Sequence, residues 1–412
     1  MRRAVITGIG VVSPLGCDLK TFWDRIKAGQ SGIKPITKFD AAGYDSRIAG
    51  QVDGFDPAAF IEKKEMRRMD EFCHYAVAAA KMAVVDSGLD MSKEVPERIG
   101  VIAGSGIGGL QTLQTQFAVL RDKGPSRCSP FMIPMMISNM AAGLIAIRHN
   151  MKGPNFSIIT ACATALHSVG EAAKIIQRND ADAIVAGGAE AAVCELGLAG
   201  FASMGALSVR NDDPTRASRP FDADRTGFVI AEGAGIVVVE ELEHARRRNA
   251  PIYCEVAGFG MTCDAFHITA PDEDGEGAKR AMQMAMKDAG LNPGDVQYVN
   301  AHGTSTKLND KIETLAIKKA FGDECARKVM VSSTKSMTGH LLGAAGGIET
   351  AVCALALRDG VVPPTINYEK PDPECDLDYV PNTARQVPIK ACLNNSLGFG
   401  GHNGCVAMRK VD

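Results

Sequence analysis

The feature that most constrains the fold of this chain is a weak internal repeat. The segment 78–104 contains an Ala-rich helical stretch, an Asp-x-Gly-Leu turn and an apolar run, and the segment 278–303 repeats this order. The segment 158–162 and the helical stretch after it are echoed in the same way by the segment 331–335. Self-similarity of this kind indicates two copies of one αβ unit. If the copies pack together, loops at equivalent strand ends meet at one site.

Short apolar runs alternate with Ala-rich helical stretches along the chain, for example at 75–86 and 278–288. This alternation predicts an α/β fold with buried sheets. We divide the chain into an N-terminal half, residues 1–250, and a C-terminal half, residues 251–412. The runs expected to form strands are 4–9, 99–103, 183–186, 235–239, 296–299, 329–332 and 405–408.

Composition excludes several classes of partner. The 412 residues carry a net charge of −3, which gives no reason to expect nucleic acid or an anionic membrane surface. No run approaches the roughly 18 apolar residues of a membrane span, and the strand-like run at 4–9 leaves no room for a signal peptide. We therefore expect no membrane insertion and a cytoplasmic location. Twelve cysteines without a CxxC pair or a Cys/His cluster predict reduced thiols and no metal site.

Cys162 is a candidate nucleophile because it lies where a β-rich segment ends and a helix of small residues begins. A helix start offers unpaired backbone N–H groups and the positive end of the helix dipole, and both favour a thiolate. The alternative on this segment alone is a small buried cysteine without chemistry.

Two histidines and a lysine in the second half are candidates to act with this thiol. His302 follows the apolar run 296–299, and His340 lies before an Ala-rich helix. A lone loop histidine is usually a surface or capping group, but two at equivalent positions of a duplicated fold are harder to dismiss. Lys335 follows another apolar run, where a solvated lysine is the alternative. Glu349 lies among apolar helix residues and needs a partner, for which Lys335 is the nearest candidate.

The glycine cluster 394–404 carries one aromatic side chain, Phe399, in very permissive backbone. This pattern fits a movable gate, and a tight turn before a closing strand explains the glycines equally well. Gly8-Ile9-Gly10 lacks the third glycine of a dinucleotide fingerprint, and the run 104–109 lacks the Gly-Lys-Ser/Thr ending of a P-loop. We therefore expect no nucleotide cofactor.

Taken together, these motifs resemble the β-ketoacyl-acyl-carrier-protein synthases, and within them the elongating (synthase II) branch. The likeness covers essentially the whole chain. Leu397, Lys307, Asn309 and Leu166 depart from the residues most frequent in the family. The motifs are Thr160-Ala161-Cys162, Asn300-Ala301-His302-Gly303-Thr304-Ser305-Thr306, Ser333-Thr334-Lys335-Ser336-Met337-Thr338-Gly339-His340, Asn395-Ser396-Leu397-Gly398-Phe399-Gly400-Gly401, Arg219-Pro220-Phe221-Asp222 and Glu232-Gly233-Ala234-Gly235.

The resemblance implies a thiolase-like duplicated fold of layered αβαβα architecture, a homodimer, and decarboxylative condensation without a cofactor or a metal. Cys162 would accept the acyl group, and His302 and His340 would stabilise the enolate formed from the malonyl substrate. Lys335, paired with Glu349, would hold the histidines electrostatically.

The resemblance also assigns residues to substrate binding. The backbone N–H groups of Cys162 and Phe399 would form an oxyanion hole, and Phe399 would gate the site. Hydroxyls of Thr269, Thr304 and Thr306 would line the path of a pantetheine arm. Ile107 and Met132 would line the acyl tunnel, Met132 from across the dimer interface.

Docking of an acidic acyl carrier protein would use a set of basic residues near the site. A solvated helix face is the alternative explanation for these charges. The residues are Lys63, Lys64, Arg67, Arg68 and Arg127.

Four related functions compete with this interpretation. A degradative thiolase needs a second cysteine in the last glycine loop, and Cys392 and Cys405 lie outside it. An initiating synthase uses a histidine and an asparagine where this chain has two histidines. A non-catalytic partner subunit of a polyketide system would lack the nucleophile. The catalytic ketosynthase subunit of such a system stays open.

Overall fold

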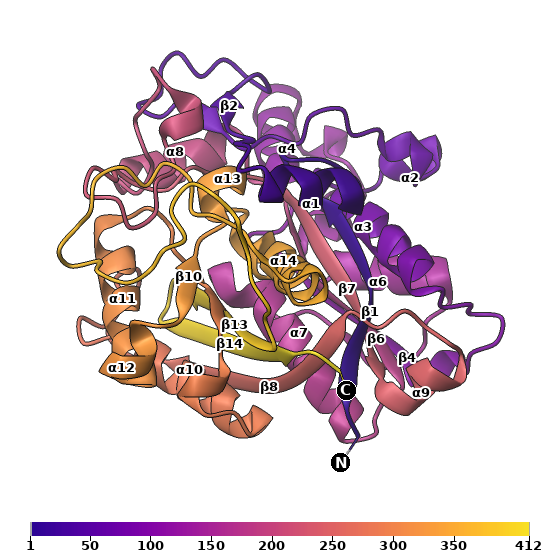
Figure 1. Cartoon of the computed structure of the whole chain (residues 1–412). Helices are drawn as coiled ribbons and strands as arrows, with labels where there is room; N and C mark the ends of the chain where they lie inside the picture. Colours follow the sequence, from indigo (N-terminus) through magenta and orange to yellow (C-terminus); the bar gives the residue numbers. More distant parts are fainter. Residues whose placement is uncertain (1, 412) are drawn as a thin grey trace.

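A ten-stranded mixed sheet runs through the computed structural model, which describes residues 2–411 (Figure 1). Its strand order is β10-β9-β13-β14-β8-β1-β7-β6-β4-β5. The strands of the first half are β1 (Ala4–Val12), β4 (Ile99–Gly104), β5 (Asn155–Phe156), β6 (Ala183–Glu190) and β7 (Gly233–Glu241). Those of the second half are β8 (Cys254–Cys263), β9 (Tyr298–Asn300), β10 (Met330–Ser332), β13 (Ala391–Gly398) and β14 (His402–Arg409). The pairs β2 (Lys34–Pro35) with β3 (Ile48–Ala49) and β11 (Val361–Val362) with β12 (Arg385–Gln386) form two small separate sheets.

The two halves of the sheet have the same topology. In each half the five strands, numbered along the chain, lie in the order 3-2-4-5-1, with two parallel pairs followed by two antiparallel pairs. The halves join at the first strand of each, where Val5 pairs with Glu255 and Ile6 with Cys254. The repeat in the sequence therefore corresponds to a repeat in structure.

Helices complete the predicted αβαβα layering. On the outer face of the first half-sheet lie α3 (Glu71–Ser87) and α6 (Met140–His149), and on that of the second lie α10 (Glu276–Ala289) and α11 (Lys307–Phe321). Between the half-sheets lie α7 (Thr164–Gln177) and α14 (Ala345–Asp359). The remaining helices are α1 (Leu19–Lys27), α2 (Lys63–Met66), α4 (Leu110–Lys123), α5 (Met132–Met136), α8 (Glu195–Ser203), α9 (Leu242–Arg247), α12 (Asp323–Ala326) and α13 (Lys335–Thr338).

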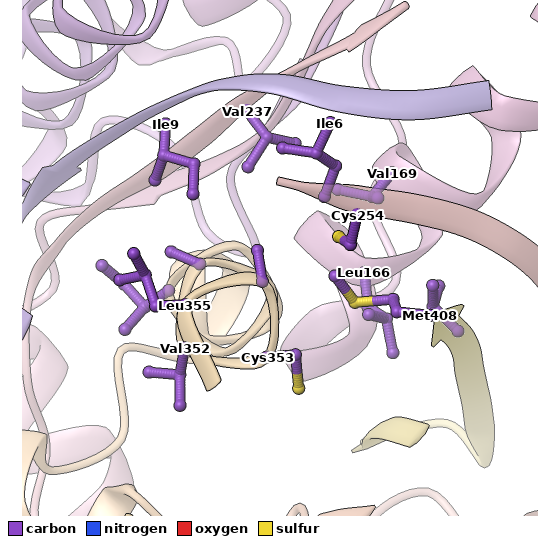
Figure 2. Packing of buried hydrophobic residues seen from close by; sticks show 14 of the residues in the cluster. Ile6, Ile9, Leu166, Val169, Val237, Cys254, Val352, Cys353, Leu355 and Met408 are labelled. Carbon is purple, nitrogen blue, oxygen red and sulfur yellow. The ribbon is translucent and has the colours of Figure 1, made fainter. Parts of the chain in front are cut away.

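The middle layer is buried because its helices are apolar on nearly every side. Every residue of α14 from Ala345 to Leu357 is buried, as expected for a helix enclosed by two sheets. Figure 2 shows Ile6 and Ile9 of β1 pointing toward this helix, whose Val352 and Leu355 belong to the same buried cluster. A Cβ at Gly347 would lie 2.1 Å from the carbonyl oxygen of Gly235, so only glycine lets α14 approach β7 this closely.

Three local expectations were wrong. The β-rich segment before Cys162 ends at Phe156, and the cysteine lies on a 3-10 turn, Ala161–Ala163. The run 296–299 forms a strand only from Tyr298. Helix α2 ends at Met66, so Arg67 and Arg68 follow the helix instead of extending it. Across residues 2–411, no helix has the length and apolar character to cross a bilayer.

Candidate active site

A cavity of about 480 Å³ lies where the loops of the two halves meet. Its lining is mostly apolar, and Cys162, His302 and His340 supply reactive groups within it. Lining residues from other parts of the chain include Ile107, Phe201, Phe228, Thr269, Thr304, Thr306, Leu342, Leu397 and Phe399.

Cys162 lies on a strained turn directly before α7. Ala161 has a φ of +49°, a conformation that non-glycine residues seldom adopt. The thiol is 8 % exposed, its Sγ lies 3.1 Å from His340 Nε2, and the backbone N–H of Phe399 also donates to it. Burial raises the pKa of Cys162 to about 12, although Lys335 and the Phe399 N–H act in the opposite direction. Loss of water therefore outweighs the groups that favour a thiolate at this site.

His340 is oriented as a hydrogen-bond donor. The backbone N–H of Leu342 donates to His340 Nδ1 at 3.3 Å, so the ring proton of the neutral imidazole lies on Nε2. Burial, with Lys335 nearby, holds the pKa of His340 well below its usual value. Nε2–H therefore points at Cys162 Sγ and at the space where a substrate atom would bind.

His302 lies just beyond β9, and its ring packs edge-on against that of His340 with centroids 5.3 Å apart. Its backbone N–H and that of Gly303 donate to the carboxylate of Glu313, each at 2.8 Å. Burial and the neighbouring charges of Lys335 and His340 hold the pKa of His302 well below its usual value. Both histidines are therefore neutral at physiological pH.

Lys335 and Glu349 form the ion pair predicted from the sequence, and both side chains are buried. Burial raises the pKa of Glu349, while Lys335 opposes this shift. The ammonium lies close enough to both histidines and to the thiol to lower the pKa of each. It thus acts as a fixed positive charge beneath the cavity.

Two sets of buried groups have donor chemistry suited to an ion. Cys162, His302 and His340 place potential ligand atoms within 4.8 Å of one another, a soft N/S set. Side-chain oxygens of Asn300, Asn394, Asn395 and Glu349 are buried without a hydrogen-bond partner, a set suited to water or a hard cation.

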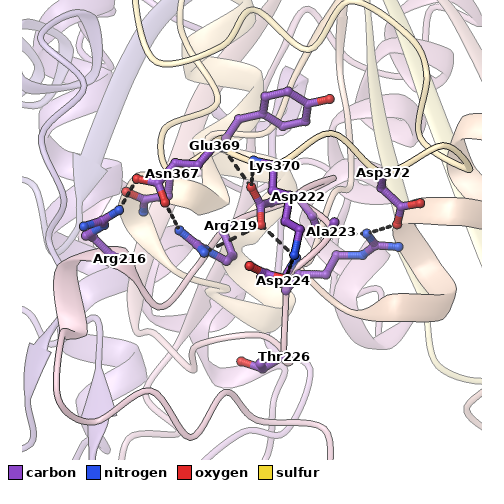
Figure 3. Close-up of polar contacts among 12 residues, drawn as sticks. Arg216, Arg219, Asp222, Ala223, Asp224, Thr226, Asn367, Glu369, Lys370 and Asp372 are labelled. Atoms are coloured by element: carbon purple, nitrogen blue, oxygen red, sulfur yellow. Dashed lines mark hydrogen bonds and ion pairs between the residues drawn. The ribbon is translucent and has the colours of Figure 1, made fainter.

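The threonines expected to contact a pantetheine arm all line the cavity. Thr304 and Thr306 lie with their hydroxyl oxygens 3.0 Å apart, and Thr269 lies on a partly exposed loop. Behind them a polar network joins the segments 216–226 and 367–372 (Figure 3). The buried carboxylate of Asp222 accepts the backbone N–H groups of Glu369 and Lys370 at 2.8 and 2.7 Å. The backbone N–H of Arg219 also donates to Ser305 Oγ at 3.0 Å. The network therefore fixes the loop that carries Thr304 and Thr306.

Only some of the residues expected to shape the acyl tunnel line the cavity. Ile107 and Leu397 line the cavity. Met132 is not among the residues that line it, and its action from a second subunit stays a prediction. Leu166 is fully buried in the middle layer against Gly346, so its departure from the family pattern affects the core instead of the cavity wall.

The basic residues expected to dock a carrier are all exposed on one side of the first half. Arg68 lies over the ring of Phe131, 4.7 Å from its centroid, which links the segment after α2 to the chain just beyond Arg127.

Two buried carboxylates at the site were missed from the sequence. Glu313 holds the backbone of His302, and burial raises its pKa to about 7. Glu190 accepts hydrogen bonds from Ser105 Oγ and from the N–H groups of Gly106, Ile107 and Gly343. The signal for Glu190 was a lone charge in an otherwise small and apolar strand, 183–190.

The chain is similar to a well-defined group of known proteins. Residues 1–245 match the family model described as β-ketoacyl synthase, N-terminal domain, and residues 253–369 match that described as β-ketoacyl synthase, C-terminal domain. The 3-oxoacyl-[acyl-carrier-protein] synthase 2 of Synechocystis sp. is 54% identical over 409 residues, covering 99% of this chain and 98% of that protein. The enzyme of the same name from Coxiella burnetii is 53% identical over 410 residues, covering 100% and 99%.

Solved structures give the same result. The chain matches a type II polyketide ketosynthase, solved with its acyl-carrier protein and bound to the hexaketide, with a TM-score of 0.92, 37% identity and full coverage of both chains. It matches a β-ketoacyl synthase from Burkholderia phymatum with a TM-score of 0.93, 33% identity and full coverage of both chains.

Proposed function

The chain belongs to the β-ketoacyl synthase family, and we propose that it elongates fatty acyl chains by condensing malonyl-acyl-carrier-protein with an acyl group held on Cys162. The observation that carries the proposal is the convergence of one thiol and two neutral histidines in a mostly apolar cavity, with His340 Nε2 3.1 Å from the thiol. This corresponds to the activity of a 3-oxoacyl-[acyl-carrier-protein] synthase of the elongating type.

In the first half-reaction, Cys162 sulfur attacks the thioester carbonyl of the acyl carrier protein substrate. The carbonyl oxygen becomes an oxyanion that accepts hydrogen bonds from the backbone N–H groups of Cys162 and Phe399. The carrier sulfur leaves and takes up the proton that the Cys162 thiol has lost, and the acyl group stays on Cys162. Because His340 Nε2 already carries a proton, it cannot take the proton of the Cys162 thiol. The thiolate therefore depends on Lys335 and on the Phe399 N–H for stabilisation.

In the second half-reaction, malonyl carrier protein enters and its carboxylate leaves as carbon dioxide. The electron pair of the broken bond moves to the thioester oxygen, forming an enolate. Nε2–H of His340, together with His302, would donate hydrogen bonds to this oxygen. The enolate carbon then attacks the acyl-enzyme carbonyl, and Cys162 leaves as the thiolate.

Mass spectrometry of the purified enzyme, incubated with acyl carrier proteins of graded chain length, tests this proposal. We expect one acyl adduct per chain on Cys162, and none in Cys162→Ala. A Cys162→Ala variant that still performs the full condensation would refute it.

We propose an acyl carrier protein as partner, docked on Lys63, Lys64, Arg67, Arg68 and Arg127. All five side chains are exposed, and the polyketide ketosynthase of similar structure was solved with its own carrier protein. The affinity should fall as salt rises and on charge reversal at Arg67 and Arg68, because electrostatic attraction would supply the docking energy. The matched control is the double variant Lys20→Glu and Lys93→Glu, which reverses the charge of two exposed lysines outside this set.

We also propose a homodimer. Strand β5 is an unpaired sheet edge, and around it lie exposed apolar side chains that are 40–75% exposed. Such a patch beside an open edge is typical of a subunit interface. Sedimentation of the wild type and of Ile147→Glu would test it, with the variant expected to shift toward monomer. The exposed apolar residues of this patch are Phe117, Ile133, Ile147, Phe156 and Ile159.

Two finer assignments complete the proposal. The chain is a duplication of units 1–250 and 251–412, supported by the shared 3-2-4-5-1 strand order. It acts in the cytoplasm, supported by its twelve free thiols.

A catalytic polyketide subunit is the second candidate, favoured by the 37% identity to a polyketide ketosynthase. Radiolabelled malonyl incorporation separates the two, because fatty acyl carrier protein and an aromatic polyketide are different products. A non-catalytic partner subunit is disfavoured by Cys162.

A further inference from the structure

His167 is a buried histidine close to Cys162 to which the reaction assigns no role. It lies in the first turn of α7 and is 5% exposed. Its Nδ1 is 2.8 Å from Thr160 Oγ1, and its Nε2 is 3.3 Å from the backbone carbonyl oxygen of Asn403. One side chain thus joins two segments that are far apart in the sequence.

The hydrogen bonds fix the state of the ring. A carbonyl oxygen can only accept, so Nε2 carries the proton, and Nδ1 of the neutral ring accepts from the Thr160 hydroxyl. Burial lowers the pKa of His167, which favours this neutral form. The ring packs against the Gly404 backbone, where a Cβ would lie 2.8 Å from Nε2, and edge-on against the Phe259 ring with centroids 5.9 Å apart.

The two joined segments are the supports of the oxyanion hole. Thr160 directly precedes the strained turn that carries Cys162, and its backbone N–H is itself held by Thr164 Oγ1 at 2.9 Å. Asn403 is in β14, just after the hairpin that carries Phe399. At the tip of β13, a Cβ on Gly398 would lie 2.7 Å from the carbonyl oxygen of Thr160, so the hairpin and the turn are in backbone contact.

We propose that His167 is a positioning residue that holds the Cys162 turn and the Phe399 hairpin in register, so that their N–H groups converge on one substrate oxygen. It does not touch the substrate. This inference rests on the proposed function, in which those two N–H groups stabilise the oxyanion. It predicts a selective defect, because enolate formation uses His302 and His340 instead.

Three variants separate the two hydrogen bonds. His167→Gln keeps a donor near the Nε2 position, His167→Asn keeps an acceptor near the Nδ1 position, and His167→Leu keeps neither. We expect His167→Leu to slow acyl transfer onto Cys162 by about 10²-fold, the lower end of the range for losing an oxyanion donor. Decarboxylation of malonyl carrier protein should change by less than about threefold. His167→Gln and His167→Asn should each recover part of the lost rate.

Thr160→Val is the matched partner variant, because it removes the hydroxyl with little change of volume and should reproduce the defect of His167→Gln. Nitrogen-15 NMR of labelled histidine in the wild type should show the proton on Nε2. An equal fall in both half-reactions, or an unchanged acyl-transfer rate in a folded His167→Leu, overturns the inference. If His167→Leu does not fold, Thr160→Val and the NMR tautomer decide. Failure of the proposed function itself would differ, because the wild type would then form no acyl-enzyme.

Discussion

The two halves of the molecule build the same turn and use it for opposite purposes. In the first half, Ala161 (φ +49°) begins a 3-10 turn that leads into α7, and in the second, Leu342 (φ +49°) begins one that leads into α14. The residue after each is Cys162 in one half and Gly343 in the other.

The surroundings of the two turns explain why only one carries a side chain. Cys162 faces the cavity, whereas a Cβ at Gly343 would lie 2.3 Å from the backbone nitrogen of Gly106. The N–H of Gly343 instead donates to Glu190, which seals this second turn against the end of β4. Strands β4 and β9 are equivalent in the two halves. Two residues after β4 the chain has Gly106, and two residues after β9 it has His302. The two halves thus contain two equivalent turns, of which one presents a thiol to the cavity and the other is closed by backbone contacts.

The largest expected effect comes from moving the thiol between the two turns. Cys162→Ala should abolish the acyl-enzyme, and Cys162→Ala combined with Gly343→Cys should not restore it, because a side chain at position 343 meets the backbone of Gly106 instead of facing the cavity. Mass spectrometry after incubation with acyl carrier protein measures both. Restoration of the adduct at position 343 would show that the turns are interchangeable.

Removing His302, whose equivalent position beyond β4 is Gly106, tests the reactive site. His302→Ala should lower malonyl decarboxylation by about 10²–10³-fold, the usual cost of losing one donor to an oxyanion, and should affect acylation less. Carbon dioxide release and acyl-enzyme formation are measured separately. Equal losses in both would contradict the assignment of His302 to the enolate.

Breaking the buried ion pair of the second half should reduce stability, besides removing the charge that stabilises the Cys162 thiolate. Lys335→Met leaves Glu349 buried without a partner, which costs about 3–5 kcal/mol in the free energy of unfolding. Denaturant unfolding provides the measurement, and Lys335→Met with Glu349→Leu should recover much of the loss. A single variant as stable as wild type would mean that the pair contributes little.

Glu190 tests the structural site, the turn that contains Gly343. Glu190→Gln replaces an acceptor of four hydrogen bonds by a group that donates toward some of the same N–H groups, at a cost of about 1–3 kcal/mol. Thermal unfolding reports the loss, with the exposed Glu324→Gln as control. Because Glu190 holds Ile107, acyl-chain preference should shift as well.

The smallest effect concerns pH. The pKa of Cys162 is raised to about 12 in the closed cavity, so its alkylation rate should keep rising with pH and show no plateau near the ordinary value of 9.0. The sign follows from burial, which favours the neutral thiol and keeps the thiolate a minor form. Iodoacetamide kinetics across this range provide the check, and a plateau below 9.0 would mean that the thiol is activated at rest.

Much of the fold could be predicted from the sequence. The internal repeat and the alternation of apolar runs with helical stretches can be recognised without knowledge of tertiary contacts. The helix 276–289 and the strands beginning at residues 4, 99 and 183 are where the apolar runs predicted them. The pairing of Lys335 with Glu349 was also predictable, because a carboxylate in an apolar helix requires a cation.

Other features depend on tertiary structure. The raised pKa of Cys162 results from the desolvated cavity, which no segment of sequence describes. The roles of Glu190 and Glu313 depend on backbone N–H groups that other segments present to them. The shortness of α2 and of β5 depends on neighbours that end each element before its pattern does.

The strand order has a consequence for synthesis of the protein. Strand β14, which follows all the other strands of the sheet in the sequence, is placed between β13 and β8 near the centre of the sheet. A nascent chain that already contains Cys162 therefore has neither the hairpin of Phe399 nor a finished second half-sheet. In the proposed mechanism the thiol gains the Phe399 N–H as oxyanion donor only when β13 and β14 are paired, so we expect chains that end before β14 to lack condensing activity.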